Sequence, residues 1–170
     1  PGETGYEADV FFAGRAKKRL HILHRLYEHL TSHDLSCDFH ISDVKEKEML
    51  YAGEIAYNQW LSYPEMIRRM QRSSSVLEIL QRPGEGPTLR MIEAIVYNKK
   101  IMTNDAGASG NPFYDKRFMH IFDVPENLDP GFIRDTGEPD YRYQDEYSAW
   151  NLIRAIEEHL APENRLFNGN

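Results

Sequence analysis

Short apolar runs alternate with stretches of helical periodicity along this chain, and this alternation limits the possible folds more than any other feature. Residues 9–13, 35–41, 54–57, 75–80, 100–103 and 119–122 are predicted strands. Residues 15–33, 63–71, 88–97 and 147–160 have the apolar spacing of helices. Strands that alternate with helices are joined by right-handed β-α-β crossovers. The sequence therefore predicts an α/β fold, a Rossmann-like three-layer domain with a mostly parallel sheet of about six strands.

Three loops rich in glycine and charge follow predicted strands. They comprise residues 14–15, 83–88 and 103–110. In open parallel sheets, ligands bind in the crevice beyond the carboxyl ends of the strands. All three loops belong to that edge, so they predict a ligand site there, although such loops also occur in sheets without ligands.

The sequence Glu-Gly-Pro-Thr-Leu-Arg-Met-Ile-Glu-Ala at residues 85–94 is the strongest functional signal. A short loop leads into a helix, and Thr88 stands where an N-cap would stand. The free N–H groups at a helix start can bind a phosphate. Glu93, about one turn further on, can accept two hydrogen bonds from a ribose diol. This pattern indicates a nucleotide or nucleotide-sugar ligand; the alternative is a capped helix with a surface glutamate.

Length and charge limit the partners. The chain has 170 residues, enough for one domain, and its net charge of −7 argues against binding along a nucleic-acid backbone. The early residues Arg15, Lys17, Lys18 and Arg19 form a basic cluster. In an acidic protein such a cluster suits a small anionic ligand. The alternative is a solvated helix start.

Several common site types are absent from the sequence. Gly14 allows close backbone approach and Arg15 offers a planar fork for phosphate oxygens. The spaced glycines of a dinucleotide fingerprint and the Gly-Lys-Ser/Thr of a P-loop are missing. A typical dehydrogenase or NTPase is therefore not expected.

The histidines and the cysteine give no clear catalytic set. His21, His24, His29 and His33 are predicted to be solvated rather than metal-bound. His40 ends a strand near the crevice, and a structural role is favoured over ligand contact. Cys37 is the single cysteine, which rules out an internal disulfide and favours a reducing compartment. No apolar run approaches the ~18 residues of a membrane span, so no transmembrane segment is expected.

Three segments carry a family resemblance: residues 10–17 (Val-Phe-Phe-Ala-Gly-Arg-Ala-Lys), 57–63 (Tyr-Asn-Gln-Trp-Leu-Ser-Tyr) and 85–94. Together they resemble the carboxyl-terminal, donor-binding domain of GT-B-fold glycosyltransferases, in a bacterial branch of polysaccharide and lipopolysaccharide biosynthesis proteins. The resemblance covers about residues 9–158.

The resemblance implies roles for named residues. Gly14 and Arg15, with Lys17 or Arg19, would bind the diphosphate. Glu85 and Gly86 would hold the donor sugar, and Glu93 the ribose. Thr88 and Leu89 would contact the donor at the helix start, and the turn that begins at Tyr57 would frame the base. Arg15 and Glu85 are the implied catalytic residues.

The expected function follows from this resemblance. Residues 9–170 would form a nucleotide-sugar-binding domain, and residues 1–8 an extension or boundary. The partners would be a nucleoside diphosphate sugar and a missing amino-terminal acceptor domain, without which the domain is inactive. No metal or other cofactor is required, and the expected location is the cytoplasm, at the inner face of the membrane through the missing domain. The alternative is a non-catalytic flavodoxin-like or Rossmann-like module that binds a phosphorylated small molecule.

Overall fold

The computed structural model describes residues 5–82, 88–148 and 151. In this part of the chain, six parallel strands form one sheet in the order β3-β2-β1-β4-β5-β6. The strands are β1 (Ala8–Arg15), β2 (Cys37–Ser42), β3 (Ala56–Tyr57), β4 (Ser73–Glu78), β5 (Lys100–Thr103) and β6 (Met119–Ile121). The α-helices are α1 (Leu20–Ser32), α2 (Tyr63–Gln71), α3 (Leu89–Val96) and α4 (Pro130–Arg134). The predicted Rossmann-like α/β fold is confirmed.

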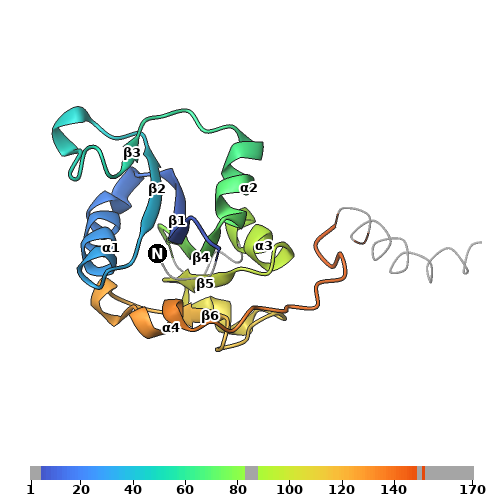
Figure 1. The fold of residues 1–170 in the computed structure, drawn as a ribbon. Helices are drawn as coiled ribbons and strands as arrows, with labels where there is room; N and C mark the ends of the chain where they lie inside the picture. The colour runs from blue at the N-terminus through green and yellow to red at the C-terminus, as the bar shows by residue number, and fades with distance from the viewer. Residues whose placement is uncertain (1–4, 83–87, 149–150, 152–170) are drawn as a thin grey trace, which may run out of the picture.

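Helices cover both faces of the sheet, which gives three layers (Figure 1). Alternate residues of β1 enter different cores: Val10 and Phe12 face α1, whereas Phe11 faces α2 and α3. The α1 side also buries Leu23, Leu26, Leu30, Phe39, Ile41 and Ile133. The α2–α3 side buries Ile67, Met70, Met91, Ala94, Ile95 and Ile101. β1 is therefore an interior strand that is buried on both faces, and its side chains form part of both cores.

The order of the strands reverses at β1. The chain first adds β2 and β3 on one side of β1, then crosses back and adds β4, β5 and β6 on the other. In sheets of this order, ligands bind outside the carboxyl ends of the strands at the point of reversal. That point lies between β1 and β4.

Local capping fixes where the two helices beside this point begin. Ser62 Oγ accepts a hydrogen bond from the Glu65 amide at 3.3 Å, and Pro64 occupies the first turn of α2. Thr88 Oγ1 accepts from the Met91 amide at 3.3 Å, so Thr88 is the N-cap that the sequence predicts. Both helices therefore start at the carboxyl edge of the sheet.

The start of the first predicted helix and one of its histidines differ from expectation. Lys17–Arg19 forms a 3-10 turn with a φ of 45° at Lys17, and α1 begins only at Leu20. The prediction that His24 is solvated is wrong, because His24 is only 8% exposed and its Nε2 lies 2.7 Å from the Tyr57 hydroxyl. The edge strand β3 brings Tyr57 over α1, and helical spacing cannot reveal that long-range contact.

The segment after β6 also departs from prediction. No helix is predicted between residues 122 and 147, yet Pro130–Arg134 forms α4 and Ile133 enters the core on the α1 side. Asp129 caps this helix by accepting from the Gly131 amide at 2.8 Å. The helix predicted at residues 147–160 lies almost entirely outside the described residues.

We predict that Ile101→Ala lowers the free energy of unfolding by about 2–5 kcal/mol, because the side chain of this central β5 residue is fully buried. Val124→Ala is the control, since Val124 is 40% exposed in a loop and should change stability by less than about 0.5 kcal/mol. Urea unfolding of both variants measures the difference. Equal stabilities would show that β5 is not part of the core.

Candidate functional site

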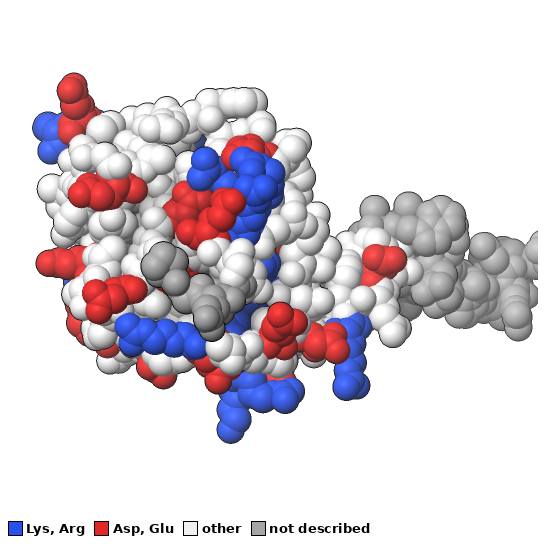
Figure 2. Space-filling model, viewed as in Figure 1, with Lys and Arg blue, Asp and Glu red and all other residues white. Residues whose placement is uncertain are grey.

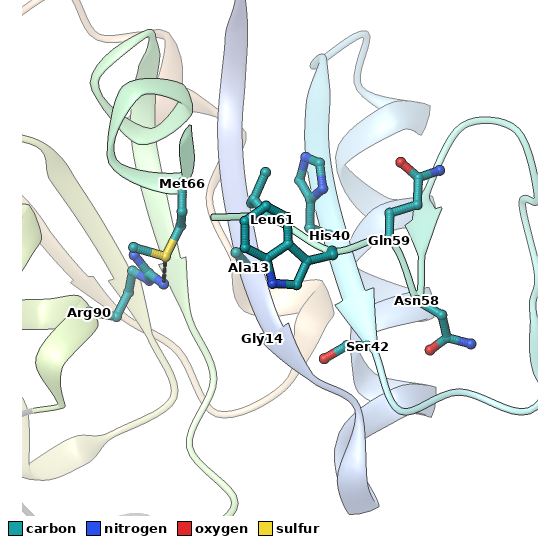
Figure 3. Close-up of a pocket in the computed structure, with 10 residues that line it drawn as sticks. Ala13, Gly14, His40, Ser42, Asn58, Gln59, Leu61, Met66 and Arg90 are labelled. Carbon is teal, nitrogen blue, oxygen red and sulfur yellow. Dashed lines mark hydrogen bonds between the residues drawn. The ribbon is translucent and has the colours of Figure 1, made fainter. Parts of the chain in front are cut away.

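A pocket of about 460 Å³ opens at the carboxyl edge of the sheet, next to the point where the strand order reverses. Its lining comes from β1, β2, α2, α3 and the loop between β3 and α2 (Figure 3). The lining residues are Ala13, Gly14, His40, Ser42, Asn58, Gln59, Trp60, Leu61, Met66 and Arg90. We call this the switch-point pocket.

Polar groups lie on both sides of the switch-point pocket. Figure 3 shows Met66 and Arg90 on one side and Gln59 and Asn58 on the other, with Gly14 between them. The Trp60 side chain belongs to the same lining and is 86% exposed. An exposed indole at a pocket offers a flat stacking surface for a planar ring.

The Asn58 side chain already has a structural role. Its Oδ1 accepts from the Val44 amide at 3.1 Å, and its Nδ2 donates to the Val44 carbonyl at 2.7 Å. Asn58 also has a φ of 51°, a conformation that Asn adopts more readily than most residues. These contacts fix the loop that carries Gln59, Trp60 and Leu61 to the pocket.

Arg90 places a guanidinium in the lining of the pocket. Its Nη1 donates to Glu93 Oε2 at 2.6 Å, and its guanidinium lies 5.8 Å from the centre of the Phe11 ring. Burial lowers the pKa of Arg90, an effect that the nearby Glu93 charge partly offsets. A guanidinium nevertheless stays charged in proteins, so Arg90 gives the pocket a fixed positive charge.

Glu93 is buried beside this pocket. The residue is 5% exposed, so the alternative of a surface glutamate is wrong. One carboxylate oxygen binds Arg90, whereas Oε1 is buried and has no hydrogen-bond partner among the described residues. Glu93 also raises the pKa of the exposed Tyr63 phenol, first through hydrogen bonding and then through its charge. A carboxylate oxygen left unsatisfied in the interior is costly and calls for an explanation.

His40 is the second buried group in this region with an unsatisfied atom. Its Nε2 lies 2.9 Å from Asp38 Oδ1, while Nδ1 is buried and has no partner in the part of the chain that the structure describes. Asp38 also accepts from Arg69 Nη1 at 3.2 Å. Burial alone would raise the pKa of Asp38, but the hydrogen bonds from His40 and Arg69 and the charge of Arg69 lower it. Asp38 is thus an ionised acceptor that orients His40.

Arg19 joins the ends of β1 and β4. Its Nη2 and Nε donate to the Arg15 carbonyl at 3.0 and 3.1 Å, and its Nη1 donates to the Ile79 carbonyl. A Cβ at Gly14 would lie 3.1 Å from Arg19 Nη2, so the absence of a side chain at Gly14 leaves room for the Arg19 guanidinium. The Arg19 guanidinium is therefore engaged with backbone, whereas the side chains of Arg15 and Lys17 are exposed.

Glu78 connects the end of β4 to the start of α3. Its Oε1 accepts from Thr88 Oγ1 and its Oε2 accepts from Thr103 Oγ1 at 2.8 Å. Glu78 is 4% exposed, and burial raises its pKa in spite of both hydrogen bonds. This network fixes the N-terminus of α3 at the edge of the sheet.

The structure brings some of the predicted site residues together. Gly14, Arg15 and Thr88 lie on the edge where β1 and β4 end, and Leu89 is 66% exposed at the start of α3. Lys17 instead lines a separate pocket with the α1 residues His21 and His24. Glu85 and Gly86 lie outside the described residues.

Tyr57 is not brought to the switch-point pocket. Its hydroxyl donates to the Leu50 carbonyl at 2.6 Å and contacts His24, and its ring packs on the α1 side of the sheet. Burial raises the pKa of this phenol to about 12, which fits a structural group. The next four residues of the same turn line the pocket instead.

Sequence reasoning missed Arg90 and Trp60 and undervalued His40. Arg90 and Trp60 stand inside two of the segments that carry the resemblance, but nothing in the spacing separates them from ordinary surface residues. For His40, the sequence Asp38-Phe39-His40 in a predicted strand was an available signal. Residues two apart on a strand share one face, so the pair could have been expected to interact.

Charge on one face of the molecule is mixed. Figure 2 shows basic and acidic side chains next to one another near α2. There Arg68, Arg69 and Arg72 pair with Glu65, Asp38 and Glu7. Such paired charges do not form the continuous basic surface that a nucleic-acid backbone needs.

Comparisons with family models, curated proteins and solved structures give no match. Within the described residues, no helix is long and apolar enough to cross a membrane. The same part of the chain has no group of three or more His, Cys, Asp or Glu placed to hold a metal ion.

We predict that Glu78→Gln becomes more stable relative to the wild type as the pH rises above 4.5, the ordinary pKa of this carboxyl group. The folded chain holds the Glu78 proton more tightly than the unfolded chain, so stability from this group is present at low pH and is lost as the pH rises through the folded pKa. Urea unfolding of both proteins from pH 4 to pH 8 measures the difference.

Glu126→Gln is the control of opposite sign, because a hydrogen bond from Arg25 lowers the pKa of Glu126. That variant should lose stability relative to the wild type as the pH rises. Parallel pH profiles for Glu78→Gln and the wild type would contradict the burial of an ionisable Glu78.

Proposed function

We propose that the switch-point pocket and the adjoining edge bind a nucleoside diphosphate sugar. The chain would then be the donor-binding half of a GT-B-type glycosyltransferase in bacterial cell-surface polysaccharide or lipopolysaccharide biosynthesis. The observation that carries this proposal is the buried Oε1 of Glu93, which has no partner among the described residues and belongs to a carboxylate paired with the pocket residue Arg90.

Glu93 suits a ribose diol. Arg90 holds one carboxylate oxygen at 2.6 Å, and this contact fixes the carboxylate while Oε1 keeps its lone pairs. Two vicinal hydroxyls supply the donors that such an oxygen lacks. A charge-assisted hydrogen bond of this kind contributes about 1.5–3 kcal/mol to binding.

The diphosphate would lie along the edge next to the pocket. Arg15 at the end of β1 has an exposed cationic side chain there, whereas the exposed Lys17 of the following turn lines a separate pocket beside α1. The N-terminus of α3 adds N–H groups and the positive end of the helix dipole. Arg19 contributes less directly, since it holds the β1 and β4 ends in place.

Transfer of the sugar would need groups on both sides of a cleft. Arg15 would stabilise the leaving diphosphate and Glu85 would hold the sugar, while the acceptor would bind a separate amino-terminal domain. Alignment of both reactants accounts for a large part of such a rate enhancement. Arg15 and the α3 N-terminus would offset the leaving-group charge, so no metal is required.

We predict that Glu93→Gln weakens binding of a ribonucleoside diphosphate about ten-fold or more, because the charged acceptor is lost. Binding of the 2′,3′-dideoxy analogue should hardly change, since it has no diol. Isothermal titration calorimetry with both ligands measures this difference.

Tyr63→Phe is the matched control, since it removes the phenol near Glu93 and leaves the carboxylate. This variant should keep the preference for the ribose form. If the wild type and Glu93→Gln bind the ribose form equally, Glu93 does not contact the diol.

We predict that Arg15→Ala weakens nucleoside diphosphate binding about ten-fold and leaves the unfolding free energy nearly unchanged, because its charged fork is exposed. Arg19→Ala should instead lower stability by about 1–3 kcal/mol, because it removes the Arg19 donors from the backbone carbonyls of Arg15 and Ile79. Calorimetry and urea unfolding separate the two effects. Loss of binding on addition of a chelator would contradict the metal-free site.

A further inference from the structure

We propose that His40 reads the base of the bound nucleotide by accepting a hydrogen bond at Nδ1 from an N–H on the edge of that base. This inference rests on the proposed function, because it assigns the base to the switch-point pocket. It adds a residue that determines specificity, and it states the chemical group that this residue recognises.

The hydrogen bonds of His40 fix its tautomer. Asp38 is ionised and can only accept, so the proton of a neutral His40 must lie on Nε2, 2.9 Å from Asp38 Oδ1. Nδ1 then carries a lone pair and acts as an acceptor. Arg69 Nη1 lies 3.2 Å from each oxygen of the Asp38 carboxylate and holds it in place. The fixed carboxylate in turn keeps Nε2, and not Nδ1, as the ring nitrogen that faces Asp38.

His40 is one of the residues that line the switch-point pocket. His40 and Ser42 lie two apart on β2 and line the switch-point pocket from the same strand face (Figure 3). Phe11 borders the imidazole, with ring centres 6.3 Å apart, and cannot hydrogen-bond to it. The His40 side chain is 11% exposed, and Nδ1 has no partner within the described chain. An acceptor that is held in one orientation and has no protein donor is expected to accept a hydrogen bond from a ligand.

The rest of the pocket suits a flat heterocycle. Trp60 provides an exposed aromatic face, and stacking on such a face tolerates every base. Gln59 and Ser42 add hydrogen-bonding side chains around the same space. Stacking would therefore supply affinity for any base, whereas His40 would discriminate by the hydrogen-bond pattern at the base edge.

The test measures the affinity of the wild-type chain for four nucleoside diphosphates and for the base-methylated form of each one. UDP is paired with its N3-methyl form, GDP with its N1-methyl form, and ADP and CDP with their dimethylamino forms. Each methylation removes an edge donor and leaves the ribose and the diphosphate intact. For the preferred base, methylation should weaken binding about ten-fold, which corresponds to one lost buried hydrogen bond.

Asp38→Asn tests the assigned tautomer. Arg69 would hold the amide oxygen, so the amide N–H₂ would face His40 Nε2 and move the ring proton to Nδ1. The variant should lose about as much affinity for the preferred nucleotide as methylation causes. The two losses should not add, because both remove the same hydrogen bond.

Two control variants separate this role from structural effects. Glu65→Gln removes another carboxylate partner of Arg69, at 3.0 Å, and should leave base preference unchanged. Trp60→Ala should weaken all bases by a similar factor and leave their ratios unchanged. Circular dichroism and thermal unfolding verify that each variant is folded.

The outcomes distinguish this inference from the proposed function. If no nucleoside diphosphate binds, the proposed function fails. If one binds and neither base methylation nor Asp38→Asn changes its affinity, the role of His40 is wrong and the nucleotide site stands. If Asp38→Asn weakens binding and the methylated base binds as well as its parent, His40 contacts another group, and its assignment to the base is overturned.

Discussion

The pairing of β1 with both β2 and β4 is the constraint on which the rest of the structure depends. β1 alternates Val10 and Phe12 with Phe11 between two cores, so neither helical layer can form without it. The same strand ends at Gly14 and Arg15, where the order of the sheet reverses. Arg19 then ties that end to the carbonyl of Ile79 beyond β4. The pairing of β1 with β2 and β4 therefore both buries β1 and forms the crevice at its carboxyl end.

Much of the fold was predictable, because periodicity is a local property. The ranges predicted for α2 and β5 agree with the structure, and Thr88 is the expected N-cap. The errors involve contacts between distant residues. His24 is buried because β3 brings Tyr57 over α1, and α4 forms because Ile133 finds an apolar site against the sheet. Neither partner can be inferred from the residues adjacent in sequence.

The candidate site was predictable to a smaller extent. The edge of the sheet could be located, because parallel strands end together and their loops are rich in glycine and charge. The burial and the hydrogen bonds of each side chain could not be predicted, because they depend on residues that are distant in the sequence. Arg19 is charged and close to the edge, yet its N–H groups bind backbone carbonyls. Glu93 was expected in the cleft or on the surface, and only the structure shows it buried and paired with Arg90.

The polar groups around the pocket are hard to explain by stability alone. A buried ion pair such as Arg90–Glu93 adds little or no stability over apolar residues of similar size, since desolvation offsets the attraction. Oε1 of Glu93 and Nδ1 of His40, which have no hydrogen-bond partner among the described residues, add further cost. Well-packed leucine or methionine at these positions would avoid that cost. A ligand that supplied donors to both atoms would remove this cost, so the groups that weaken the empty site would strengthen the occupied site that we propose.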